Sequence, residues 1–175
     1  GLGAKVAEDP AQLARDSEVI GLCVRDDGDV EALLHGRAGL LENARRGSII
    51  AVHSTVTQKA LLAWASAAAS RGLHLIDAPI TGGAAGAEAG TLAYMVGGDA
   101  AVLERCRPVF ETSGSKIIHA GAIGSGIALK LCNNLMTYAA FAAIHEANAL
   151  ALASGLDPAL LVEVGRANGV VTQQM

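Results

Sequence analysis

Short apolar runs alternate with helical patterns along the first two-thirds of this 175-residue chain. Residues 18–24 form a nearly continuous apolar run, and residues 48–52 and 73–76 form two more. Runs of this kind are typical of strands that are buried on both faces of a sheet. The pattern therefore predicts an α/β fold, with a mostly parallel sheet covered by helices on both faces. The expected helices are 29–34, 40–45, 57–71 and 100–110, and further strand candidates are 92–96 and 116–119.

The pattern changes near Gly121. No glycine or proline interrupts the chain between Gly126 and Gly155, which predicts one helix of roughly thirty residues and about 45 Å. Asp157 and Pro158 then form an N-cap and first-turn proline for another helix. We expect an α/β part over residues 1–120 and the start of an all-helical part over residues 121–175.

Composition excludes several classes of function. The net charge of −4 offers no basic field for nucleic acid or anionic lipid. The three cysteines and five histidines show no disulfide framework and no metal-ligand spacing, so no metal site is expected. The most apolar stretch, 137–156, contains His145, Glu146 and Asn148, which predicts a buried or bundle helix in preference to a membrane span. With charged residues already in its first ten positions, the chain is expected to be soluble and cytoplasmic.

A glycine-rich stretch follows the third predicted strand and runs from Asp77 through Gly83 to Thr91. Ligands of open α/β sheets bind at the carboxyl ends of the strands. Paired glycines let backbone N–H groups approach a ligand, and the Thr81 hydroxyl adds another donor, so the stretch suits a carboxylate or phosphate. A flexible surface loop is the simpler alternative.

Lys130 begins a second polar group, on the long predicted helix. Asn134 lies four residues later, on the same helix face, and Asn133 stands beside it. Burial would lower the pKa of a lysine, which a catalyst of proton transfer can use. The alternative is a lysine whose ammonium group simply reaches water past the helix surface.

A third polar group, Ser54 and Thr55, follows the second predicted strand. Its simplest interpretation is an N-cap for the next helix. The same hydroxyls would also face a ligand lying across the ends of the strands. Gly1 and Gly3 lack both a preceding strand and a third glycine, so we do not assign them to a dinucleotide loop.

Together these motifs resemble the β-hydroxyacid dehydrogenase family, which includes 3-hydroxyisobutyrate dehydrogenase and tartronate semialdehyde reductase. The resemblance covers essentially the whole chain. It rests on Asp-Ala-Pro-Ile-Thr-Gly-Gly at 77–83, Gly-Thr-Leu at 90–92, Met-Val-Gly-Gly at 95–98, Gly-Ser-Gly at 124–126, and Lys130 with Asn133 and Asn134. It implies a partial Rossmann-type doubly wound sheet, a long interdomain helix and an NAD(P)-dependent oxidoreductase.

The resemblance also implies roles for individual residues. Lys130 matches the catalytic lysine, which exchanges a proton with the substrate oxygen. Thr81, Gly82 and Gly83 match the loop that binds the substrate carboxylate, and Asn133 and Asn134 match amides that orient the substrate. Val24, Arg25 and Thr55 match positions that touch NAD or NADP. Arg25 stands where the family commonly has proline, and Thr81 stands where serine is more frequent.

The family implies further segments and partners. Its members begin with a GxGxxG unit that does not precede Gly1, and their helical part extends further than Met175, so we expect this chain to be a fragment. A small carboxylate substrate and a homodimer or homotetramer are implied, while the particular β-hydroxy acid and the choice between NAD and NADP stay open. Alternatives are a non-catalytic carboxylate-binding or dimerisation module, or a relative resembling 6-phosphogluconate dehydrogenase or an imine reductase. Asn133 and Thr137 disfavour a relative of 6-phosphogluconate dehydrogenase. Lys130 disfavours an imine reductase.

Overall fold

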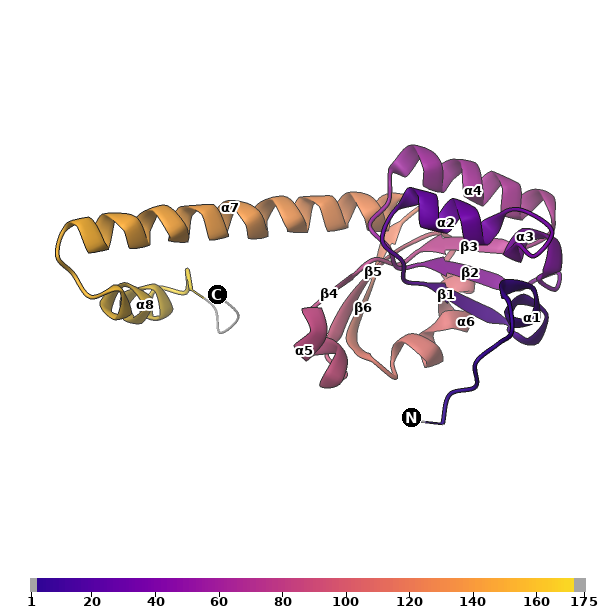
Figure 1. The fold of residues 1–175 in the computed structure, drawn as a ribbon, viewed down its shortest axis with the longest axis horizontal. Helices are drawn as coiled ribbons and strands as arrows, with labels where there is room; N and C mark the ends of the chain where they lie inside the picture. Colours follow the sequence, from indigo (N-terminus) through magenta and orange to yellow (C-terminus); the bar gives the residue numbers. More distant parts are fainter. Residues whose placement is uncertain (1–2, 172–175) are drawn as a thin grey trace. The chain divides into compact units, whose positions relative to one another are not determined.

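The computed structural model describes residues 3–171 (Figure 1). Two compact units divide the chain between Lys130 and Leu131, within a long helix. The sequence pattern predicts the boundary between the two parts earlier, near residue 121. The last strand ends at that residue, and the long helix begins shortly after it. The two units are described separately below.

The first unit is built on a six-stranded sheet with the order β1-β2-β3-β5-β4, in which β6 pairs with β5. The first three strands are parallel, as predicted. Strand β5 runs antiparallel to β3 and β4 but parallel to β6. The strands are β1 (Val19–Leu22), β2 (Ile49–Val52), β3 (His74–Asp77), β4 (Ile80–Thr81), β5 (Leu92–Gly97) and β6 (Gly114–Gly121).

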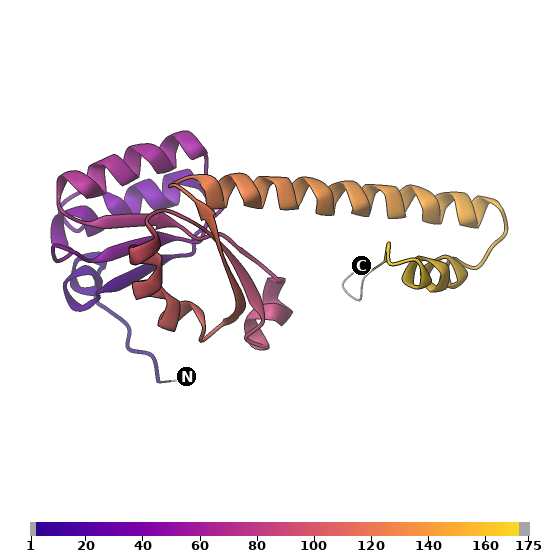
Figure 2. The same ribbon diagram turned by 180° about the vertical axis from the view of Figure 1, so that it is seen from behind.

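Helices cover both faces of this sheet, which confirms the predicted layering. Two views of the ribbon show α2 and α4 on one face and α6 on the other (Figures 1 and 2). The central strand β2 is buried along its whole length. Its Ile50 and Val52 pack with the first set of helices, while Ile49 and Ala51 pack with α6. The helices of this unit are α1 (Pro10–Asp16), α2 (Asp27–Leu34), α3 (Leu40–Asn43), α4 (Gln58–Ser70), α5 (Gly83–Glu88) and α6 (Ala100–Phe110).

Four local features differ from the predictions. Helix α1, short strand β4 and helix α5 were not predicted, and α5 occupies the stretch expected to be a loop. The N-cap of α4 is Thr57, whose hydroxyl accepts a hydrogen bond from Ala60 N at 3.3 Å, so the assignment of that cap to Ser54 or Thr55 is wrong. Asp27 fixes this cap by accepting from both the backbone N–H and the hydroxyl of Thr57, at 3.0 and 2.6 Å.

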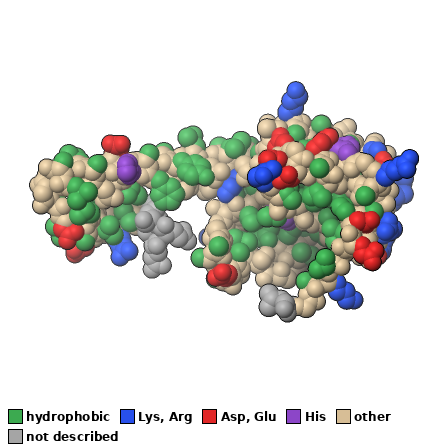
Figure 3. Space-filling view, in the orientation of Figure 1, with side chains coloured by type: hydrophobic (Ala, Val, Ile, Leu, Met, Phe, Trp, Pro, Cys, Tyr) green, Lys and Arg blue, Asp and Glu red, His purple; other side chains and the backbone are tan. Residues whose placement is uncertain are grey.

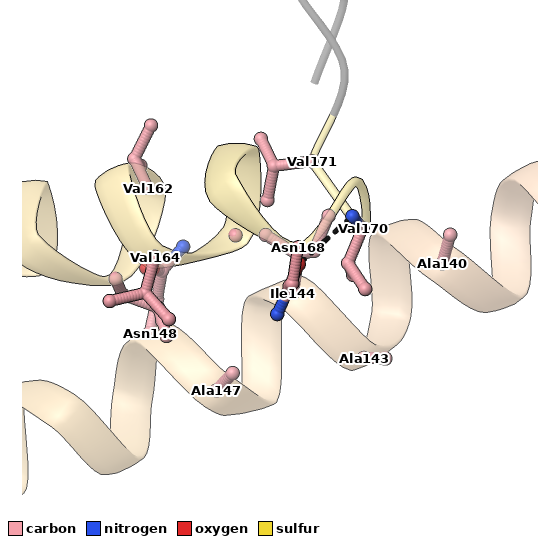
Figure 4. A pocket seen from close by; sticks show the side chains of 12 residues that line it. Ala140, Ala143, Ile144, Ala147, Asn148, Val162, Val164, Asn168, Val170 and Val171 are labelled. Carbon is pink, nitrogen blue, oxygen red and sulfur yellow. Dashed lines mark hydrogen bonds between the residues drawn. The ribbon is translucent and has the colours of Figure 1, made fainter.

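Helices dominate the second unit. Helix α7 (Ser125–Ala153) starts in the first unit and continues through the second, followed by α8 (Pro158–Ala167). Asp157 caps α8 by accepting a hydrogen bond from Ala159 N at 2.9 Å, as predicted. The two helices enclose a cavity of about 310 Å³, whose lining residues include Ile144, Val164 and Val170 (Figure 4).

Helix α7 is less buried than its sequence predicts. By length and composition it is the one helix among residues 3–171 that could cross a membrane, with a mean hydropathy of 1.3 over the most apolar window. Only 6% of that window is buried. Leu135, Met136 and Leu150 are among its exposed side chains. The expected burial is therefore absent from the part of the chain that the structure describes.

Candidate functional site

Three polar segments meet the same edge of the sheet. Residues 23–25 follow β1, residues 53–55 follow β2, and residues 78–83 follow β3, which ends at Asp77. Because β1, β2 and β3 are parallel and adjacent, their carboxyl ends lie side by side. This is the edge at which open α/β sheets bind ligands.

Ser54 holds the segment after β1 against β2. Its hydroxyl accepts a hydrogen bond from Val24 N at 2.8 Å and lies 2.7 Å from Val24 O, to which it donates. The side chain is buried, with 5% exposure. The two residues are thirty positions apart in the sequence, so a local pattern could not reveal the contact. Ser54 thus fixes the backbone of Val24, one of the predicted cofactor contacts.

Replacing Ser54 with alanine is expected to raise the KM for the dinucleotide that the resemblance implies roughly three- to tenfold, because the Val24 backbone loses both hydrogen bonds to the Ser54 hydroxyl. Steady-state kinetics of the intact protein measures this. Ser48→Ala is the matched control, since Ser48 is equally buried at the opposite end of β2 and donates to Ser17 O at 3.2 Å. An equal rise of KM in both variants would show only a general loss of stability.

His53 joins the ends of β2 and β3. Its Nδ1 lies 2.8 Å from Ala78 O, so the neutral ring donates from that nitrogen. Burial lowers the pKa of His53, although the hydrogen bond to Ala78 opposes the shift. The ring also packs edge-on against Tyr94 and Phe110, which stack with centroids 4.6 Å apart. His53 therefore supports the sheet edge as a neutral structural group.

The predicted carboxylate loop, Thr81 to Gly83, joins β4 to α5. Thr81 pairs with Ala93 on β5, which fixes where the loop starts. Gly82 has φ +126, and a Cβ atom there would come within 3.1 Å of the Leu92 side chain. Only glycine meets both conditions without strain. The first N–H groups of α5 follow directly and have no partner within the helix, which gives the donors that a carboxylate needs.

Asp77 connects this loop to the start of α7, and sequence analysis did not assign it this function. Its carboxylate is fully buried. One oxygen accepts from Gly124 N at 2.8 Å and the other from Ile127 N at 2.7 Å. A carboxylate at a helix N-terminus is stabilised by the unpaired N–H groups and the helix dipole. The partners lie 47 and 50 residues away in the sequence, beyond the reach of local patterns.

Two glycines make this junction possible. A Cβ atom on Gly97 would overlap Asp77 Oδ1, and one on Gly126 would overlap the Met95 carbonyl oxygen and lie 2.9 Å from Asp77 Oδ2. Strand β5 and helix α7 therefore approach each other closely around the carboxylate. Asp77 therefore fixes the first turn of α7 to the end of β3, the strand that precedes the Thr81 loop.

Lys130 lies one turn after Gly126 on α7 and is half-buried. Burial lowers the pKa of its ammonium group. No hydrogen bond or ion pair to Lys130 is found among residues 3–171, so nothing there offsets the loss of hydration. A half-buried lysine with a lowered pKa can gain and lose a proton more readily than an exposed one.

The remaining predicted residues differ in their surroundings. Thr55 is exposed, and the Arg25 side chain is 80% exposed beside Asp26 and Asp29. Asn133 and Asn134 follow Lys130 on α7, are half-buried and belong to the second unit. The first unit thus holds Val24, Arg25 and Thr55 at the strand ends, and Thr81–Gly83 and Lys130 on segments linked through Asp77. The roles of these residues stay predictions.

Comparison with known proteins agrees with this architecture. Residues 1–124 match the family model of the NAD binding domain of 6-phosphogluconate dehydrogenase. The chain is 41% identical to 3-hydroxyisobutyrate dehydrogenase of Pseudomonas aeruginosa over 162 residues, which are 93% of this chain and 54% of that protein. It is 37% identical to 2-(hydroxymethyl)glutarate dehydrogenase of Eubacterium barkeri over 168 residues, covering 95% and 56%. The chain thus spans about half the length of the curated relatives it matches.

Solved structures of related proteins also match the fold of this chain. The Mycobacterium tuberculosis 3-hydroxyisobutyrate dehydrogenase with L-serine matches with a TM-score of 0.83 at 34% identity, over 92% of this chain and 54% of that one. The structure of Psf3 in complex with NADP⁺ and 2-OPP matches with a TM-score of 0.91 at 27% identity, over 98% and 61%. With the family match covering most of the sequence, the chain belongs to the β-hydroxyacid dehydrogenase family and carries an NAD-binding domain of Rossmann-like fold.

Proposed function

We propose that the intact protein transfers a hydride between NAD or NADP and a small β-hydroxy acid, with Lys130 as the general acid and base. The observation that carries the proposal is the half-buried Lys130, whose pKa burial lowers, on a helix that Asp77 ties to the strand before the Thr81 loop. A proton-transfer group and a carboxylate-binding loop are thereby attached to one buried carboxylate.

The residues at the strand ends fit the nicotinamide end of a dinucleotide. Ser54 fixes both backbone hydrogen-bonding groups of Val24, and the half-buried, apolar Val24 side chain would contact the nicotinamide ring. Thr55 is exposed at the next strand, with its hydroxyl available as a donor. The dinucleotide supplies or accepts the hydride, and the protein positions it.

Other residues of this chain would bind and orient the substrate. The N–H groups after Gly82 and the Thr81 hydroxyl would hold its carboxylate, and Asn133 and Asn134 would bind its polar groups. Lys130 would donate a proton to the carbonyl oxygen during reduction and accept the hydroxyl proton during oxidation. Fixing the carboxylate and the oxygen together orients the reacting carbon, which lowers the entropic cost of the transfer.

A substrate panel tests the proposal. Hydroxyisobutyrate, glycerate, hydroxypropionate and hydroxybutyrate are assayed with the intact protein, each with NAD and with NADP. We expect dinucleotide reduction with at least one of these acids. Binding of the acids without turnover, by a folded protein that binds the dinucleotide, would favour the alternative of a non-catalytic carboxylate-binding module.

The exposed apolar face of α7 supports a proposal about assembly. Leu135, Met136, Tyr138 and Leu150 are more than half exposed on this helix. Contiguous exposed apolar surface marks sites of protein association. We propose that this face is covered in a homodimer or homotetramer, which light scattering of the intact protein would measure.

A further inference from the structure

A cavity of about 290 Å³ lies at the amino ends of β1 and β2, opposite the edge that carries the candidate site. It belongs wholly to the first unit. Basic and acidic side chains both lie at this end of the unit, near α1 and α3, in the space-filling view (Figure 3). The cavity is lined by Glu18, Arg45, Arg46, Gly47, Ser48 and Arg105.

The charge of this cavity is opposite in sign to that of the chain. Three arginines and one glutamate line it, whereas the whole chain carries a net charge of −4. Glu18 pairs with Arg105 at 2.8 Å and so compensates one of the cations. Arg45 and Arg46 have no ion pair among residues 3–171. Two positive charges at one cavity favour binding of an anion, because their repulsion is then offset.

Hydrogen-bond donors at the cavity are also in excess. Arg45 uses its Nε to donate to Arg15 O, and Arg105 uses one terminal nitrogen to donate to Gly47 O at 2.9 Å and to Glu18. The remaining guanidinium N–H groups of these two side chains have no acceptor in the described part of the chain. No acceptor within that part is found for the Arg46 guanidinium, which lies beside Gly72.

Two of these arginines are oriented by the protein itself. The contacts to Arg15 O, Gly47 O and Glu18 hold Arg45 and Arg105 in place before any ligand binds. Guanidinium groups bind phosphate oxygens through paired N–H donors, and a fixed orientation reduces the entropy that binding must overcome. A small anion with several acceptor oxygens matches both the charge and the donors of the cavity.

We propose that this cavity is a second ligand site that binds a phosphate dianion, either inorganic phosphate or the phosphoryl group of a small metabolite. The ligand would accept hydrogen bonds from Arg45, Arg46 and Arg105, and Glu18 would stay paired with Arg105. The site lies at the opposite end of the strands from Lys130 and does not depend on the proposed dehydrogenase activity.

Calorimetric titration of the intact protein with inorganic phosphate tests this site, with the dinucleotide held at saturation so that its own phosphate subsites are occupied. We expect one phosphate per chain and an affinity that falls about tenfold or more in Arg46→Gln, because charge-assisted hydrogen bonds are lost. Arg46→Lys should retain part of the affinity, since the charge remains without the paired donors. Arg37→Gln is the control, because Arg37 is an exposed arginine like Arg46 but lies outside the cavity.

A parallel titration with glycerol phosphate distinguishes the two sources of the anion. Tighter binding of glycerol phosphate would identify a phosphorylated metabolite as the ligand, and equal or weaker binding would identify inorganic phosphate. Unchanged thermal unfolding of Arg46→Gln would show that the variant is folded. Equal affinities of the wild type, Arg46→Gln and Arg37→Gln, or no binding at millimolar phosphate, would overturn the proposal.

Discussion

Replacing Lys130 with alanine is expected to lower kcat by about 10²–10⁴-fold, the usual contribution of a positioned general acid or base. The dinucleotide affinity should change little, because the predicted cofactor contacts lie at the ends of β1 and β2 and not on α7. Stopped-flow kinetics and fluorescence titration of the intact protein measure the two quantities separately. An unchanged kcat in Lys130→Ala would contradict the proposed mechanism.

The pH dependence gives a second readout for Lys130. Burial lowers its pKa below the ordinary lysine value of 10.5. Oxidation needs the neutral amine, so its rate should rise with pH and level off above the lowered pKa. Reduction needs the ammonium form, so its rate should fall over the same range. Lys130→Arg should abolish both pH limbs, because the pKa of arginine lies above the range of the assay.

An exposed lysine outside the predicted site residues, Lys59, provides the control for these experiments. Lys59 lies on the exposed surface of α4. We expect Lys59→Ala to leave kcat and both pH limbs unchanged. A similar loss in the two variants would show that net charge, and not the position of Lys130, determines the rate.

Much of the fold could be predicted, because local sequence patterns (apolar runs and residues typical of helix ends) indicate most of its strands and helices. Strands β1, β2 and β3 each lie in a mainly apolar run, of which only β2 is buried throughout, and α7 and α8 begin and end at glycine, proline or aspartate signals. Helix α5 was missed because its Gly-Ala sequence has the composition of a loop, and Gly86 packs against Leu92 there. The antiparallel direction of β5 was also hidden, because hydrophobic runs do not record strand direction.

The candidate site was predicted less completely than the fold. Sequence motifs identified Lys130, a lysine in an otherwise apolar helix, and Thr81–Gly83, a threonine followed by paired glycines. Ser54 and Asp77 were not recognised as supporting residues, since their partners lie from thirty to fifty positions away. Such contacts arise only when separate strands and helices come together, so one sequence without its fold does not identify them.

The second large effect is expected at Asp77. Asp77→Ala would leave the buried N–H groups of Gly124 and Ile127 without an acceptor, which should lower the free energy of unfolding by about 2–6 kcal/mol. Asp77→Asn keeps the shape and one acceptor oxygen but presents an NH₂ group to the other N–H, so a loss of about 1–3 kcal/mol is expected. Denaturant unfolding of the intact protein measures both losses.

Asp77→Asn also distinguishes positioning of Lys130 from general stability. If the carboxylate fixes the first turn of α7, the folded variant should lose kcat while the dinucleotide affinity is retained, because α7 can shift relative to the Thr81 loop. Asp99→Ala is the matched control: Asp99 caps α6 through Ala101 N and Val102 N but is exposed, so water replaces it at a cost of about 1 kcal/mol. Its kcat should stay at the wild-type value. If Asp77→Asn retained wild-type kcat despite its lower stability, Asp77 would hold the fold together without positioning the lysine.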